Sequence, residues 1–475
     1  MEPAGYDIGG TLHVVARDRE RFHQPIVVTT MACVVADPDA RPIRLVVRDG
    51  DLTRTRLTVF FRLFLAIPHF IWLTLWGIAA FVVAFILWLA VLIEGKAPEN
   101  LHDFVAGYVR YATHVASYVL LAADPYPGFR GAPGYAVDVE IDPPVRQGRW
   151  GGFFRLILAL PALLLASALG GGFSSGSPGQ SSSWQWSNGG SEQAVWFGLS
   201  VGGAASAAAF LAWFAILARG SAPRGLRDLT AFAIGYGAQT GSYLLLLTPR
   251  YPTSDPKLAE PFAELPEHPV RIVVTDDLER PRLTVVFRLF LVIPHLIWLM
   301  LWSIAAFFAV IAAWVSGLVT GRIPLALHRY LAAYVRYATH VIAFLYVVGR
   351  RFPGFTGRAG SYGIDVEIDL PMSQNRWKIL FRFFLALPAL ILGSALGGVA
   401  VVVGFLGWWY ALARGRMPEG LRNLGASCLR YNAQTYAYLG LLTDRYPCAA
   451  PVLEEATPGE LVDWPDPLAF TGDAF

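Results

Sequence analysis

Three long apolar stretches limit what this chain can fold into more than any other feature of its sequence. Residues 59–93, 285–319 and 379–413 each contain a single charged side chain, an arginine. A helix that crosses a bilayer needs about 20 consecutive apolar residues, so each stretch can span one with residues left over. The chain is 55% hydrophobic and only 15% charged, whereas a soluble domain carries about 25% charged residues. The sequence therefore predicts a membrane-inserted protein.

An internal repeat organises these stretches. The segment 56–69 returns with few changes at 282–295, and 153–161 resembles 380–388. Copies one and three match closely, as do copies two and four, so the chain looks like a two-unit module duplicated in tandem. In every copy an arginine precedes a proline by six positions, and the four pairs are Arg62/Pro68, Arg155/Pro161, Arg288/Pro294 and Arg382/Pro388.

The repeat sets the expected domain bounds. We expect a soluble N-terminal segment, four repeat units and an acidic, mobile tail. The bounds are 1–40 for the N-terminal segment, 41–130 for unit one, 135–254 for unit two with a Gly/Ser-rich insert at 170–193, 268–355 for unit three, 361–447 for unit four and 448–475 for the tail.

Each unit combines a short strand, the long apolar stretch and a second helix. The Gly/Ser-rich insert interrupts the apolar stretch of unit two, and its backbone would be unsatisfied in hydrocarbon. We therefore expect the equivalent point in unit one, near Gly77, to lie close to water. That places an interfacial helix at about 55–76 and a spanning helix at about 77–95. The predicted fold is a membrane all-α bundle of about eight transmembrane helices plus interfacial helices. If the interfacial helices also cross, the number is nearer twelve.

The strands carry opposite charges. Carboxylates alternate along 137–142 and 364–369, and arginines alternate along the strands of the partner units. We expect the four strands to form one small β-sheet on one membrane side, with cross-strand ion pairs of about 0.2–1 kcal/mol each. A divalent-cation site is the alternative, but the glycine-containing loop of a calcium motif is missing. The carboxylates are Asp138, Glu140, Asp142, Asp365, Glu367 and Asp369, and the arginines are Arg44, Arg48 and Arg271.

These motifs resemble a known family. The string Phe-Arg-Leu-Phe-Leu-Ala-Ile-Pro-His, the Gly-Arg-Ile-Pro at 321–324, the Arg-Tyr of the second helix and the closing Asp-Arg-Tyr-Pro at 444–447 are similar to the bacterial domain of unknown function numbered 4389. The resemblance covers most of residues 40–447, with one copy per unit. It implies a bacterial multi-pass membrane protein and implies no activity.

The second helices carry the candidate functional residues. Arginine and histidine four positions apart share one helix face, and an ionisable side chain inside a membrane is a functional candidate because its insertion is costly. The competing interpretation is that these groups hydrogen-bond to one another and only hold the bundle together. The candidate intramembrane polar face consists of Arg110, Tyr111, His114, Tyr236, Gln239, Arg336, Tyr337, His340, Arg430, Tyr431 and Gln434.

The arginines of the apolar stretches have a different expected role. Arg62, Arg155, Arg288 and Arg382 are predicted to anchor the helices by reaching lipid headgroups. His69 and His295 are weaker candidates, since units two and four have alanine at that position.

No recognisable enzyme or cofactor motif occurs in the sequence. Neither a Gly-x-Ser-x-Gly elbow, a His-Glu-x-x-His pair nor a phosphate-binding loop is found. We therefore predict no catalytic residue, cofactor or metal. The three cysteines form no evident framework, and a net charge of +3 gives no argument for nucleic acid binding.

Two function classes remain open from the sequence. The first is a membrane scaffold that binds partner proteins through its sheet or acidic tail. The second is a transporter or lipid-handling protein with a pathway between its duplicated halves, where repeat-built transporters place their sites. In either case the bilayer is the predicted partner. The predicted location is the bacterial cytoplasmic membrane with the N-terminus in the cytoplasm, and the sequence does not determine the oligomeric state.

Overall fold

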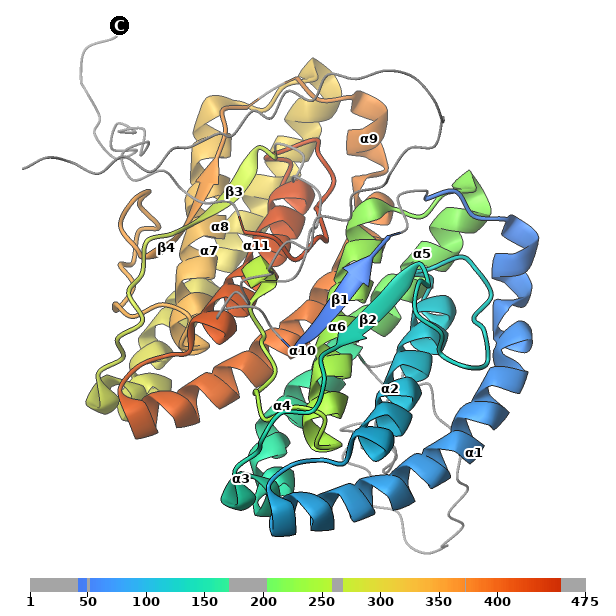
Figure 1. Ribbon diagram of the computed structural model, residues 1–475. Helices are drawn as coiled ribbons and strands as arrows, with labels where there is room; N and C mark the ends of the chain where they lie inside the picture. The colour runs from blue at the N-terminus through green and yellow to red at the C-terminus, as the bar shows by residue number, and fades with distance from the viewer. Residues whose placement is uncertain (1–41, 49–51, 171–202, 259–267, 372, 454–475) are drawn as a thin grey trace, which may run out of the picture. The chain divides into compact units, whose positions relative to one another are not determined.

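The computed structural model describes residues 42–48, 52–170, 203–258, 268–371 and 373–453 (Figure 1). The predicted N-terminal segment 1–40, nearly all of the Gly/Ser-rich insert and most of the acidic tail lie outside these ranges. We call residues 42–258 the first half and 268–453 the second half. The first half contains β1 (Ile43–Val47), α1 (Arg56–Glu94), α2 (Glu99–Val119), β2 (Val137–Ile141), α3 (Arg149–Phe153), α4 (Arg155–Gly170), α5 (Ala204–Arg219) and α6 (Arg224–Leu244).

The second half repeats this order. After a 3-10 turn at Pro256–Leu258, it contains β3 (Val270–Val274), α7 (Arg282–Thr320), α8 (Leu325–Leu345), β4 (Ile364–Ile368), α9 (Arg376–Leu380), α10 (Arg382–Arg414) and α11 (Glu419–Leu439). The helices α2, α6, α8 and α11 each have 21 residues, and we call them the short helices. We call α1, α7 and α10 the long helices.

The four strands form two sheets and not one. Strand β1 pairs antiparallel with β2, and β3 pairs antiparallel with β4. Each sheet lies on the short helices of its own half, where the Val139 carbonyl accepts a hydrogen bond from Arg110 and the Val270 carbonyl accepts one from Gln434. This packing keeps each sheet within its half, so the expected single sheet is wrong.

The predicted cross-strand charge pairs are present. Arg44 lies 3.4 Å from Glu140 in the first sheet, and Arg271 lies 3.3 Å from Asp369 in the second. These side chains are partly exposed, so each pair contributes about 0–1 kcal/mol to stability.

The long helices are continuous. Helix α1 runs through both Pro68 and Gly77 for 39 residues, so the predicted break near Gly77 is wrong. Glycine leaves room for the Tyr108 side chain of α2, since a Cβ on Gly77 would lie 3.1 Å from the Tyr108 hydroxyl. Figure 1 shows α1 as a long arc beside α2. At 1.5 Å per residue the helix is about 58 Å long, well beyond the roughly 30 Å of a bilayer's hydrocarbon core.

Three helices among the described residues are long and apolar enough to cross a membrane, and they are α1, α7 and α10. The short helices are not among them, since polar side chains interrupt them and they are largely buried against the sheets. The predicted two spans per unit, eight in all, are therefore not confirmed. Helices α4 and α5 are apolar but have only 16 residues each.

The two units of each half interlock at their helix–helix turns. The turn that ends α5 pairs with the segment before α1, where the Arg54 amide donates to the Gly220 carbonyl over 2.9 Å. Conversely, the turn that ends α1 receives the Gln147 amide on the Gly95 carbonyl over 2.8 Å. In the second half the Arg280 amide bonds Gly415, and the Gln374 amide bonds Gly321. Each unit's turn therefore holds the start of the other unit.

Small side chains bring the two halves together. Helix α5 buries Ala204 and Ala208, and α10 buries Ala400. The apolar cluster that contains the three alanines also includes Leu169 of α4. Small residues allow helix backbones to approach closely, as in membrane helix pairs.

Candidate functional site

The arginine near the start of each long stretch caps the end of a short helix. Arg62 is 2% exposed and donates to the carbonyls of Tyr118 and Ala123, each over 3.0 Å. Its guanidinium also pairs with the Asp124 carboxylate at 2.7 Å and lies over the Tyr118 ring. The last carbonyls of a helix have no partner within the helix, so Arg62 satisfies groups that would otherwise be buried and unpaired.

Arg155 and Arg288 repeat this arrangement, whereas Arg382 bonds a carbonyl of the turn that follows its short helix. Arg155 bonds the carbonyls of Tyr243 and Thr248. Arg288 donates to Phe344 over 2.7 Å and to Gly349 over 3.3 Å, and Arg382 donates to Thr443 over 3.0 Å. Each guanidinium lies within 4.2–4.4 Å of the centre of an aromatic ring in the helix it caps, namely Tyr243, Phe344 and Tyr438.

These four arginines are buried inside the protein. All four are at most 4% exposed, and their donors point at backbone carbonyls inside the protein. In this structure they have a capping role in place of the headgroup-anchor role that the sequence suggested. Other arginines are exposed, and those at or near the helix–helix turns include Arg56, Arg219, Arg282, Arg322, Arg376, Arg414 and Arg416.

The capped turns contain a left-handed residue that is not glycine. Leu121, Leu246, Val347 and Leu441 have φ between 62° and 64°, although helix ends usually place glycine at this position. Such a conformation costs about 1–3 kcal/mol for other residues. All four side chains are buried, so apolar burial and the capping arginine hold the turn in place.

A buried carboxylate joins each of the short helices α2 and α8 to the sheet of its half. His114 of α2 lies 2.8 Å from Asp138 of β2, and Arg110 of the same helix lies 3.5 Å from it. Asp138 also accepts the amides of Gly134 and Val139, each over 2.8 Å. We call this cluster the strand clamp.

The second half contains the same strand clamp. His340 lies 2.8 Å from Asp365, Arg336 lies 3.5 Å from it, and the Val366 amide donates to it over 2.8 Å. The Gly360 amide is a further donor. The predicted Arg–His face is thus brought together with a carboxylate of the strand, and it faces the sheet.

In units two and four a glutamine occupies the place of the histidine. The side-chain oxygen of Gln239 accepts the Thr253 amide, and that of Gln434 accepts the Cys448 amide, each over 2.9 Å. Arg430 bonds the carbonyls of Ala450 and Val452. These residues therefore fasten the segment that follows each short helix.

The four tyrosines of the predicted face point away from the strands. The Tyr111 hydroxyl lies 2.7 Å from His69 of α1, and the Tyr337 hydroxyl lies 2.8 Å from His295 of α7. Tyr236 and Tyr431 lie in the apolar cluster where the halves meet. The residues of the predicted polar face therefore make three kinds of contact. Some bind the strands, some bind the segment after the short helix, and the tyrosines contact the long helices or the apolar cluster between the halves.

The sequence missed the carboxylate partner of the histidines. Asp138 and Asp365 were assigned to cross-strand pairs, and Asp138 does lie 3.6 Å from Arg48. Both carboxylates are nevertheless almost fully buried, at 1% and 4% exposed. One sequence pattern could have predicted the contact between histidine and aspartate. The Arg-Tyr-Ala-Thr-His motif of units one and three is followed by a Val-Asp-Val-Glu or Ile-Asp-Val-Glu strand. Among the described residues no group of three or more His, Cys, Asp or Glu side chains is placed to hold a metal.

The strand clamp makes stability depend on pH. Burial by itself raises the pKa of Asp138, but hydrogen bonds from His114 and the two amides outweigh it and hold the pKa below its ordinary value of 3.8. A lowered carboxylate pKa adds stability that is fully present above the unfolded-state pKa and is lost as pH falls through the folded-state pKa.

We expect Asp138→Asn to destabilise the protein most at neutral pH. Unfolding midpoints of wild type and variant, measured in detergent from pH 7 to pH 2, should converge below about pH 4. Glu140→Asn serves as the exposed control on the same strand. A constant gap between wild type and Asp138→Asn across this range would contradict the assignment.

Comparison with known proteins finds one family that is similar to part of the chain. No curated protein and no solved structure matches it. The family model described as "Domain of unknown function (DUF4389)" matches residues 56–130, 282–356 and 376–450. These segments begin where α1, α7 and α9 begin, six residues before each capping arginine, and they end after the adjoining short helix. The expected match in four copies is therefore found in three, and over those three segments the chain is similar to the DUF4389 family.

Proposed function

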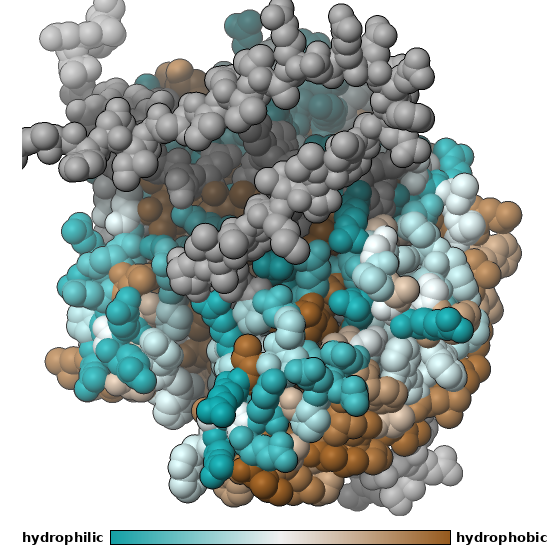
Figure 2. Space-filling view, viewed as in Figure 1, coloured by the Kyte–Doolittle hydropathy of each residue, from teal (hydrophilic) through white to brown (hydrophobic). Residues whose placement is uncertain are grey.

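We propose that this protein is an integral membrane scaffold whose long helices lie in the bilayer. The observation that carries the proposal is the exposure of α1, α7 and α10. Phe81 of α1 is 75% exposed, Phe307 of α7 is 62% exposed and Phe405 of α10 is 54% exposed. Figure 2 shows an apolar surface along the edge that α1 forms. A soluble protein rarely exposes a contiguous apolar surface of this extent.

We further propose that residues 135–254 are a fourth, divergent copy of the unit. They contain a strand, β2, and a 21-residue helix, α6. Arg155 caps that helix as its counterparts do, and Leu246 has the same left-handed conformation as Leu121. The Gly/Ser-rich insert lies where the other copies have a continuous long helix.

The packing between the halves favours a scaffold over a transporter. The predicted pathway would run where α4 and α5 meet α10, but apolar side chains fill this contact. Leu165, Ala204, Leu392 and Val399 are each at most 1% exposed. The polar candidates of the short helices are likewise engaged in caps and strand clamps. The partner surfaces that we propose are the two sheets and the acidic tail, on the cytoplasmic side of a bacterial membrane.

Site-directed fluorescence tests the membrane placement. A full-length chain with its three cysteines replaced by alanine receives a single cysteine at Phe307, and the fluorophore attached there is exposed to lipids with a nitroxide on the acyl chain. Strong quenching is expected at Phe307, and weak quenching is expected at the matched control Glu140→Cys on β2. Equal quenching at both positions would refute the proposal.

Proteoliposomes test the scaffold against its alternative. We expect the reconstituted chain to move neither protons, cations nor lipids above the rate of empty vesicles. Flux that disappears in the double variant His114→Ala/His340→Ala, with folding intact, would instead establish a pathway and overturn the scaffold assignment.

A further inference from the structure

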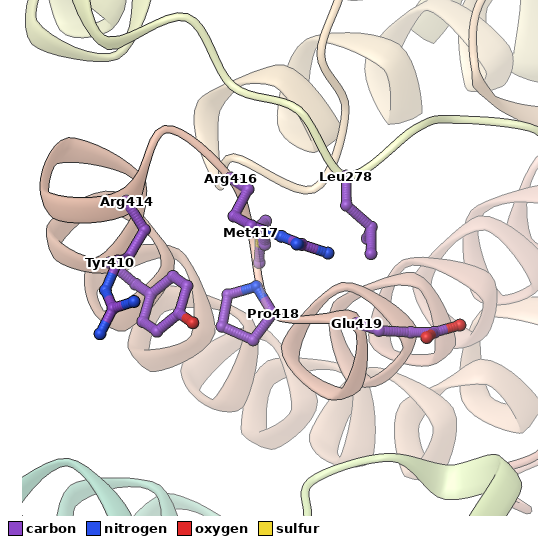
Figure 3. Close-up of a pocket in the computed structure, with 7 residues that line it drawn as sticks. All are labelled: Leu278, Tyr410, Arg414, Arg416, Met417, Pro418 and Glu419. Atoms are coloured by element: carbon purple, nitrogen blue, oxygen red, sulfur yellow. The ribbon is translucent and has the colours of Figure 1, made fainter.

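A cationic pocket lies where α10 ends and α7 begins. Two adjoining hollows of about 330 and 720 Å³ share Leu278, Arg414 and Arg416 as lining residues, and Arg282 lines the larger one. In Figure 3 the Arg414 side chain lies beside the Tyr410 ring, whereas the Glu419 carboxylate points away from it. The lining of the two hollows contains four arginines and two glutamates, Glu279 and Glu419.

The backbone around the pocket is fixed. The Met417 amide donates to the Leu278 carbonyl and the Arg280 amide to the Gly415 carbonyl, each over 2.8 Å. Gly415 has a φ of +72°, which favours glycine. The Arg282 guanidinium donates to the Ala413 carbonyl over 2.9 Å. Hydrogen bonds therefore hold the turn that carries the arginines in a defined conformation.

Three of the surrounding arginines have no carboxylate partner among the described residues. Arg280 is fully buried and pairs with Asp276 at 2.6 Å. In contrast, Arg282, Arg414 and Arg416 are exposed, and none of them has a carboxylate within 4.0 Å among the residues that the structure describes. The hollows have two acidic lining residues, and both pair with other arginines: Glu419 lies 3.4 Å from Arg422, and Glu279 lies 3.2 Å from Arg350. An anion could therefore bind here without displacing an existing ion pair.

The surroundings indicate what kind of anion fits. Leu283 at the start of α7 is 73% exposed, and Trp409 near the end of α10 is 56% exposed. Cations next to apolar helix ends lie at the depth of lipid headgroups when the helices are inserted. Arginine donates two parallel hydrogen bonds to a phosphate. We propose that Arg282, Arg414 and Arg416 bind the phosphate of an anionic membrane phospholipid, an inference that rests on the membrane placement of α7 and α10.

The first half supplies a matched comparison. There the Ala222 amide bonds Leu52 over 2.8 Å, and Arg56 bonds the Ala218 carbonyl over 3.2 Å. Arg219 takes the place of Arg414, but Ser221 takes the place of Arg416. This turn lacks the third arginine of the proposed site, but it has Arg224 in place of Glu419 and Thr53 in place of Glu279, so its net charge is more positive. Weaker lipid binding there would therefore report the missing Arg416 and not a lower net charge.

Short-chain lipids test the site on the full chain in detergent. We expect dihexanoyl phosphatidylglycerol to bind wild type, and Arg414→Gln/Arg416→Gln to weaken that binding about tenfold because charge-assisted hydrogen bonds are lost. The control Arg56→Gln/Arg219→Gln should change it less than threefold. Dihexanoyl phosphatidylcholine and inorganic phosphate, titrated separately, distinguish the lipid from a free anion.

Three results would overturn the site. They are equal affinity of wild type and Arg414→Gln/Arg416→Gln, equal affinity for the phosphatidylcholine, or inorganic phosphate bound as tightly as the anionic lipid. The acyl-chain quenching at Phe307 is measured on the same variants. A variant that is quenched normally but binds lipid unchanged refutes this site alone, whereas loss of quenching in the wild type refutes the membrane placement itself.

Discussion

Replacing Asp365 with alanine is expected to lower the free energy of unfolding by about 3–5 kcal/mol, the range for breaking a buried charge pair from one side. The Asp365 carboxylate accepts from His340 Nε2 and from the Val366 amide, each over 2.8 Å, and lies 3.5 Å from Arg336. Alanine leaves two cationic or polar side chains and two amides facing an apolar gap. Asp365→Asn should cost less, because the amide oxygen still accepts one or two of these bonds.

Glu367→Ala is the control for this prediction. Glu367 lies on the same strand, and its ion pair with Arg271, at 3.6 Å, is about one-third exposed. An exposed pair contributes about 0–1 kcal/mol. Denaturation of the purified chain in detergent, followed by tryptophan fluorescence, compares the two variants. Equal losses of stability would mean that the strand clamp is no more than a surface ion pair.

Arg288→Met is expected to cost about 3 kcal/mol, because two buried carbonyls lose their donors at once. Arg288 is 1% exposed and bonds the Phe344 and Gly349 carbonyls, and its guanidinium lies over the Phe344 ring. Methionine fills a similar volume without any donor. The left-handed Val347 lies in the same turn, so its strain is no longer held by the cap.

The exposed Arg322 provides the comparison. Arg322→Met should change the unfolding midpoint little, since surface substitutions usually lie within about 0.5 kcal/mol. If Arg288→Met were as stable as Arg322→Met, the helix-capping role of the buried arginines would have to be abandoned. If the two variants were equally stable but only Arg288→Met lost membrane insertion, the result would support the headgroup-anchor role of Arg288.

The apolar stretches and their repetition could be predicted from the sequence alone. Runs such as 285–319 leave a helix no polar face, so a helix long and apolar enough to cross a membrane follows from composition. The alternation of charge along 137–142 likewise predicted cross-strand pairs, because side chains alternate between the two faces of a strand. Helix α7 and the Arg271–Asp369 pair bear these expectations out.

Other features depended on which surfaces meet. From the sequence alone, Gly77 suggests a break in the helix. In the structure the helix continues, and Gly77 lies against Tyr108 of the neighbouring helix. Arg62 suits a headgroup and a helix cap equally well by chemistry, and only its distance from the Tyr118 and Ala123 carbonyls separates the two. The division of four strands into two sheets depends on which short helices lie beneath them.

By itself the sequence determined the long apolar helices, the similarity of the repeated segments and the pairing of charged strands, because each follows from local composition and period. The tertiary structure alone decided that the polar residues of the short helices face strands and helix ends. A buried arginine or histidine is defined by its partners, and those partners lie 24 to 61 residues away along the chain for His114 and Arg62. No local pattern encodes a contact over that separation, since it exists only once the short helix and the strand have packed together.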